Sequence, residues 1–330
     1  MLVGGALTQV LDWRATMYVN VVFSAIAFIG GALLLSNRRD ATGSTLDLPG
    51  TILISAGLFS VVFGFSNVET YTWGSPLTWG FLLTGVVLVV AFAWWQTRAR
   101  HPLLPLRVLT DRNRAASFAT LLITGAALFG VLLFLTYYLQ RNLGFGPIET
   151  GLAFLPMIAV MMVTAQIATG KIVPRIGPKT VLPAGYLLGA VGLFWLARIT
   201  ADSQYLTGIL PPLLLIGAAL GSVIPPAISL ATDGVDAADA GVTSAAVNAM
   251  QQVGGSIGTA LLNTLATSAA ASYLIGKDAT DPATVAQSDL TGYSTAFAWA
   301  AGLFLTGGVI TAVVYRRTTV DRAHSHEGQS

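Results

Sequence analysis

Residues 151–169 read GLAFLPMIAVMMVTAQIAT, residues 170–179 read GKIVPRIGPK, and residues 180–197 read TVLPAGYLLGAVGLFWLA. The first run has no charge over 19 residues, and a helix of that length covers the ~30 Å hydrocarbon core of a bilayer. The middle run gathers three cations and two glycines. The stretch therefore predicts two membrane-spanning helices joined by a tight basic turn, which is retained in the cytoplasm by its Lys and Arg residues.

The composition of the whole chain is that of a membrane protein. Of its 330 residues 54% are hydrophobic and 10% are charged, and the mean hydropathy is +0.71. Soluble domains carry about 25% charged residues. The apolar runs are continuous, whereas a membrane barrel shows short alternating segments. We therefore expect an all-α, polytopic membrane protein in the plasma membrane, with the lipid bilayer as its solvent.

Several classes of function are disfavoured by the same residues. The chain has no cysteine, which excludes thiolate metal sites, and its net charge of +2 comes from loops between spans, so we expect no nucleic-acid partner. The three histidines lie in predicted loops or the tail, at positions 101, 324 and 326. No carboxylate pair falls inside a predicted span. We expect no enzyme, no cofactor and no metal site.

Nine complete spans are expected, at residues 18–35, 48–68, 76–96, 115–138, 151–169, 180–197, 206–231, 241–267 and 293–315. Asp47, which precedes a proline at position 49, is expected to cap the second of them. The first eleven residues are apolar but cover only about 16 Å as a helix, roughly half a crossing. This start is either a re-entrant segment or the second half of a helix.

The positive charges predict the orientation. Thirteen of the 17 Lys and Arg residues lie in connections on one side, and the other four are Arg14, Arg141, Arg198 and Lys277. This bias places the turn at 170–179 and the C-terminus in the cytoplasm. Residues 97–114, with five arginines, are expected to connect two membrane units, and residues 268–292 to form a solvated outer loop.

A polar row runs along the predicted span at 241–267. Its members recur at steps of four, three, four and four, which keeps them on one face of a helix. They are Asn248, Gln252, Gly255, Thr259 and Asn263. Because amides are costly toward lipid, the row is expected either to line a water-filled cavity or to bond neighbouring helices. Gln166, in the span at 151–169, is a further cavity candidate or an interfacial amide.

Small residues form a second pattern in the last spans. Gly254, Gly255 and Gly258 make a surface on which another helix can approach closely, and Gly217 and Gly221 make a similar one. Helix packing is one interpretation, and a bending or rocking role is the other.

The turn at 170–179 resembles the cytoplasmic signature of the major facilitator superfamily, G-x-x-x-D-R-x-G-x-K/R, in its second-half copy. Gly170, Arg175, Gly177 and Lys179 match, and Pro174 replaces the acidic residue. The span at 241–267 resembles the corresponding helix of the fourteen-span drug/proton antiporter branch. The opening Gly4-Gly5, followed by Asp12-Trp13-Arg14 and Asn20, is similar to the end of that branch's antiporter motif, with helix-packing glycines.

This resemblance implies an N-terminally truncated transporter without its first four helices and half of the fifth. Residues 1–35 would be a remnant of the N-terminal six-helix half, and 36–96 two extra linker helices. Residues 97–114 would be the cytoplasmic connection, 115–315 the C-terminal six-helix half, and 316–330 a cytoplasmic tail. The C-terminal half would consist of two three-helix inverted repeats.

The resemblance also implies a function. The parent protein would export hydrophobic or cationic small molecules in exchange for protons, by rocking two halves around a central cavity. Its proton-carrying carboxylates would belong to the missing N-terminal half, so we expect that this chain alone does not catalyse proton-driven efflux. Two alternatives stay open: a truncated or split transporter half without activity of its own, or a membrane scaffold.

Overall fold

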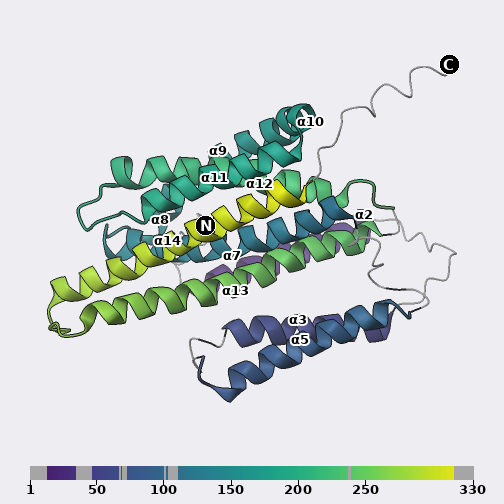
Figure 1. Ribbon diagram of the computed structural model, residues 1–330, viewed down its shortest axis with the longest axis horizontal. Coiled ribbons are helices and arrows are strands. Elements are labelled where there is room, and N and C mark those ends of the chain that lie inside the picture. Colours follow the sequence, from purple (N-terminus) through teal and green to yellow (C-terminus); the bar gives the residue numbers. More distant parts are fainter. Residues whose placement is uncertain are drawn as a thin grey trace.

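The structure is a computed structural model that describes residues 13–34, 47–66, 68, 73–99, 102, 111–236 and 239–315. The predicted packing glycines Gly4 and Gly5, the three histidines and the tail lie outside these residues. The described part is all helical, which confirms the predicted fold class (Figure 1). The N-terminal helices are α2 (Trp13–Leu34), α3 (Leu48–Ser66) and α5 (Pro76–Gln96).

A six-helix block follows, formed by the chain from α7 to α14. Its first half contains α7 (Arg112–Arg141), α8 (Pro147–Ala153), α9 (Leu155–Ile167), η1 (Ala168–Ile172), α10 (Val173–Ile176) and α11 (Pro178–Leu196). Its second half contains η2 (Tyr205–Ile209), α12 (Leu210–Thr232), α13 (Ala240–Leu274) and α14 (Pro282–Val314). The segments from α8 to α10 form one continuous rod, as do η2 and α12.

Eight helices in the described part are long and apolar enough to cross a membrane. The expected span at 241–267 corresponds to α13, which has 35 residues but is too polar to meet the same criterion. It nevertheless packs along α7 and α14, on the side of the block that faces α3 (Figure 1). Its position, and not its hydropathy, therefore marks α13 as a member of the block.

The prediction of a solvated loop at residues 268–292 is wrong. Helix α13 continues to Leu274 and α14 begins at Pro282, so that only residues 275–281 connect them. Residues 268–272 read SAAAS, and alanine is the strongest helix former. Asp281 then caps α14, because its carboxylate accepts hydrogen bonds from the backbone N–H of Thr284 at 3.0 Å and of Ala283 at 3.3 Å.

The basic turn is also tighter than predicted. The helix of α9 continues through the π-helical turn η1 into α10, and the chain reverses at Gly177, whose φ is +79°. That backbone conformation is accessible mainly to glycine. Although α9 and α11 are consecutive, they do not pair as a hairpin, because α12 packs between them.

Close glycine contacts hold two helix pairs together. On α13, a Cβ added to Gly254 or Gly258 would collide with backbone atoms of α7, at Leu122 and Ala126 respectively. On α12, Gly217 and Gly221 lie in the same way against backbone oxygens of α9, at residues 157 and 161. The same four-residue step at both interfaces is what two inverted repeats would produce; the division of the chain into units stays a prediction.

Buried aromatic and hydroxyl groups join the middle of the block. The Tyr186 hydroxyl of α11 donates to the Thr120 carbonyl oxygen of α7 at 2.9 Å and lies 2.8 Å from Thr124 Oγ1. The Tyr186 ring meets Phe304 of α14 edge-on, with 5.3 Å between ring centroids. Helices α7, α11 and α14 are therefore linked at mid-height, and α13 covers one side of α7.

Candidate substrate-facing site

The polar row of α13 lies along a partly open side of the block. Asn248 and Gln252 are exposed, Thr259 and Asn263 are half-buried, and Gly255 is buried. The glycine faces α7, since an added Cβ would lie 2.8 Å from the ring of Phe129. The Asn248 amide donates to the Ser244 carbonyl oxygen of its own helix at 3.2 Å.

A cavity of about 320 Å³ adjoins this row, between α3, α7 and α13. Gln252 and Thr259 line it from α13, and the rings of Phe65 and Phe129 line it from α3 and α7. Its other lining residues are Ser66, Gly255, Ser256 and Ala260. Aromatic walls with a few amide and hydroxyl groups are the surroundings that small amphipathic molecules prefer in proteins.

The structure brings together two of the four predicted cavity residues, Gln252 and Thr259. Asn248 lies one turn away on the same helix, and Gln166 is exposed on α9 and does not line this cavity. Sequence reasoning missed the two phenylalanines, because an apolar residue inside an apolar span carries no sign that it faces a cavity.

Helix α3, which pairs with α5 in a hairpin, forms the outer wall of this cavity, and Figure 1 shows the hairpin beside α13. Trp73, between the two helices, donates its indole N–H to Thr264 Oγ1 of α13 at 2.8 Å. Its own carbonyl oxygen accepts the Trp79 indole N–H at 2.8 Å. This pair of tryptophans therefore links one end of the hairpin to the six-helix block.

Asp47 organises the opposite end of the hairpin. Its carboxylate caps α3, as predicted, by accepting the Gly50 backbone N–H at 2.9 Å. It also accepts the Trp95 indole N–H at 2.8 Å and the Gln96 amide N–H at 2.9 Å, both from the end of α5. One carboxylate therefore binds the start of α3 to the end of α5.

The signature residues lie at the end of the block where Gly177 reverses the chain. Gly170, Arg175 and Lys179 are exposed, and an added Cβ at Gly170 would meet nothing within 4 Å. Within the described residues neither Arg175 nor Lys179 has an ion-pair partner. Pro174 provides no carboxylate, so the charge relay of the family signature cannot be formed from this segment alone.

Two arginines at the same end have a role that the sequence did not reveal. Arg112 donates to the Val313 and Val314 carbonyl oxygens at the end of α14, at 2.8 and 2.7 Å. Arg114 donates to the Asp233 and Gly234 carbonyl oxygens that follow α12, at 3.0 and 2.9 Å. Cations stabilise helix C-termini because the last carbonyls lack partners within the helix.

In the described part of the chain, no three His, Cys, Asp or Glu side chains come together in a group that could hold a metal ion. Residues 1–259, more than three quarters of the chain, match the family model of the Major Facilitator Superfamily.

The chain belongs to this superfamily. Members of this superfamily are multi-pass membrane proteins, in agreement with the eight candidate spans in the described part of the chain. The chain is 40% identical to the puromycin resistance protein of Streptomyces alboniger over 316 residues, which are 95% of this chain and 62% of that protein.

Two further relatives are named for export. The cephamycin export protein of Amycolatopsis lactamdurans is 33% identical, over 80% of this chain and 55% of that protein. The tetracenomycin C resistance and export protein of Streptomyces glaucescens is 31% identical, over 80% of this chain and 49% of that protein. The predicted drug-export branch is confirmed, and the chain spans about half to three fifths of the length of these relatives.

Proposed function

We propose that the protein exports hydrophobic, often cationic, small molecules, and that the polar face of α13 borders their path. Exposed amides on a helix inside a membrane bundle carry this proposal, because amides facing lipid are costly and mark a polar path. The names of three relatives, which refer to resistance against or export of antibiotics, support the substrate class. The cavity beside Gln252 would hold a substrate between aromatic rings.

In this proposal transport couples to protons, and the Gly177 end of the block faces the cytoplasm. The charge bias of the loops supports that orientation. Two carboxylates lie within the described helices, both close to helix starts. Glu149 accepts the Gly146 backbone N–H at the start of α8, and Asp289 lies near the start of α14, 3.7 Å from Arg141. An ion pair at a helix end is poorly placed to carry a proton through the membrane. The coupling carboxylates would therefore belong to the part of the relatives that this chain does not match.

The proposal predicts that this chain needs further polypeptide for export. It is tested with a chimera in which the chain replaces the matching part of the Streptomyces alboniger protein. Cells loaded with a fluorescent hydrophobic cation are compared in three forms: chain alone, chimera, and chain coexpressed with the remainder of that relative. Export by the chimera but not by the chain alone is the expected result.

Export by the coexpressed pair would favour a split transporter. Absence of export in every form, with normal membrane expression, would favour a scaffold and contradict the proposal.

Substitutions in the chimera test the α13 face. Gln252→Leu and Asn248→Leu should change the range of exported molecules or lower the rate of export. Gln140→Leu, which changes an exposed amide near the end of α7 outside the cavity, is the matched control and should export normally. If all three variants export like the parent, the α13 face does not border the path.

A further inference from the structure

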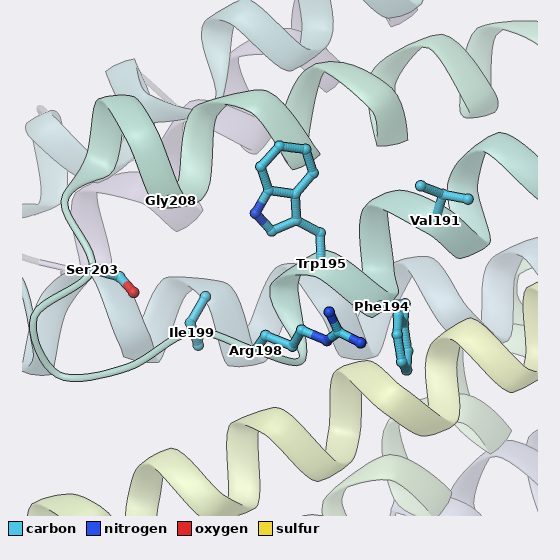
Figure 2. A pocket seen from close by; sticks show the side chains of 7 residues that line it. All are labelled: Val191, Phe194, Trp195, Arg198, Ile199, Ser203 and Gly208. Atoms are coloured by element: carbon cyan, nitrogen blue, oxygen red, sulfur yellow. The ribbon is translucent and has the colours of Figure 1, made fainter.

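Arg198 lies just beyond α11, between two hollows of the surface. One, of about 340 Å³, is lined by Val191, Trp195, Gly208 and others (Figure 2). The second, of about 410 Å³, separates the same end of α11 from α14. Figure 2 shows the Arg198 side chain directed toward Phe194, with Trp195 pointing away from both. A single cation is therefore accessible from two sides.

The Arg198 guanidinium has no carboxylate partner within the described residues. Its Cζ atom lies 4.6 Å from the centroid of the Phe194 ring, which holds the side chain against the end of α11. Arg141, at the same end of the bundle, provides the contrast, because it lies 3.7 Å from the Asp289 carboxylate. Arg198 is therefore positioned by an aromatic ring while its charge remains available to an anion.

An apolar stripe leads along α11 to this cation. Leu187, Val191, Phe194 and Trp195 fall at helical spacing and are between 46% and 58% exposed. The 19 residues of α11 cover about 28 Å, close to the ~30 Å of a hydrocarbon core. Arg198 follows the last residue of the helix by two positions, and so lies at the depth of lipid headgroups.

Polar groups of α14 lie on the other side of the cation. Gln287 and Ser294 line the second hollow together with Arg198. Neither the Gln287 amide nor the Ser294 side chain is hydrogen-bonded in the described part of the chain, so both remain available to the oxygens of a headgroup. The second hollow combines a cation with uncharged donors, and Phe194 of the stripe lines both hollows together with Arg198.

We propose that this surface binds an anionic phospholipid, with its phosphate on Arg198 and one acyl chain along the exposed stripe of α11. A free phosphate ion would use the cation alone, whereas a lipid uses both the cation and the stripe. A zwitterionic headgroup would bring a second, cationic group, and no carboxylate is among the residues that line either hollow. The inference does not depend on which molecules the protein transports.

The test is lipid binding to the purified full chain in detergent, measured by native mass spectrometry. Phosphatidylglycerol and phosphatidylcholine with identical acyl chains are titrated separately into wild type, Arg198→Gln, Arg198→Lys and Arg141→Gln. Arg198→Gln should weaken phosphatidylglycerol binding about fivefold, as expected for one basic residue near an anionic membrane surface. Arg198→Lys and Arg141→Gln should bind as the wild type does, and phosphatidylcholine should bind equally to all four.

Equal phosphatidylglycerol binding by wild type and Arg198→Gln would overturn the proposal. Equal loss in Arg141→Gln would also overturn it, because any cation at that end would then suffice. Inorganic phosphate is added as a competitor. If it displaces phosphatidylglycerol, the surface binds anions in general and is not a lipid site, which contradicts the proposal. Val191→Ser keeps the cation and should still weaken phosphatidylglycerol binding; unchanged binding would remove the stripe from the site. Circular dichroism of each variant establishes that it is folded.

Discussion

Gly258→Ala should separate α13 from α7. The added Cβ would coincide with backbone atoms of Ala126, and these atoms cannot turn away as the end of a flexible side chain can. The two helices would have to move apart until the contact reaches an ordinary 3.4–4 Å. Because the obstacle is backbone, overpacking costs about 3 kcal/mol, and alanine recovers roughly 1 kcal/mol of helix propensity, which leaves a net loss of about 2 kcal/mol.

The matched control is Gly302→Ala on α14, where an added Cβ meets nothing within 4 Å. Alanine there should stabilise the helix by ~0.5–1 kcal/mol, because glycine loses more conformational freedom on folding. Both variants are unfolded by denaturant in detergent micelles and followed by circular dichroism. The reasoning is refuted if Gly258→Ala is as stable as the parent, or if the two substitutions shift the midpoint in the same direction.

Three further predictions concern the hairpin and the loop after α13. Trp73→Phe removes the N–H that reaches Thr264 and should loosen the hairpin from the block by ~0.5–1.5 kcal/mol, seen as faster hydrogen exchange in α3 and α5. Asp47→Ala removes the carboxylate that accepts hydrogen bonds from Trp95 and Gln96 of α5 and should destabilise the hairpin by ~1–3 kcal/mol. Hydrogen bonds from Thr284 lower the pKa of Asp281, so exchange protection at the start of α14 should hold above the ordinary carboxyl pKa of about 3.9 and disappear as pH falls through the lower folded value.

Each of these predictions has a control. Trp79→Phe loses a bond within the hairpin and should leave its attachment to α13 unchanged; equal effects would contradict the Trp73 role. Asp111→Ala removes only a helix cap, that of α7, so an equal loss for Asp47→Ala would mean that the α5 donors contribute nothing. For Asp281, protection that already falls near neutral pH, or that persists in strong acid, would show that its carboxylate does not stabilise the loop.

The positions of the spans could be predicted because lipid demands a certain length and composition from each segment separately. Helix α5 matches the predicted run at 76–96, and α3 begins at the predicted residue 48. The predicted helix ends were wrong where the chain leaves the apolar core, because helix propensity and capping residues decide there where a helix ends. Asp281 followed by Pro282 is a sequence pattern typical of a helix start, and α14 does begin there. The hydropathy of the chain instead predicts a start at residue 293, eleven residues later.

The partners of polar residues could not be predicted. Trp73 bonds a residue 191 positions further along the chain, and nothing near either residue indicates the other. Gln252 and Thr259 could be assigned to one face from their spacing, but the rings opposite them come from two other helices. Periodicity identifies the face of a helix, and only the folded chain shows what that face meets.

The contacts of Arg112 and Arg114 have a consequence for evolution. Both side chains bind main-chain oxygens, at positions 313, 314, 233 and 234. A main-chain oxygen is present whichever amino acid occupies those positions, so mutational drift there leaves the junction intact, whereas drift at either arginine removes it. We therefore expect no pairwise covariation among relatives between the arginines and these four positions, although the contacts join the ends of α7, α12 and α14.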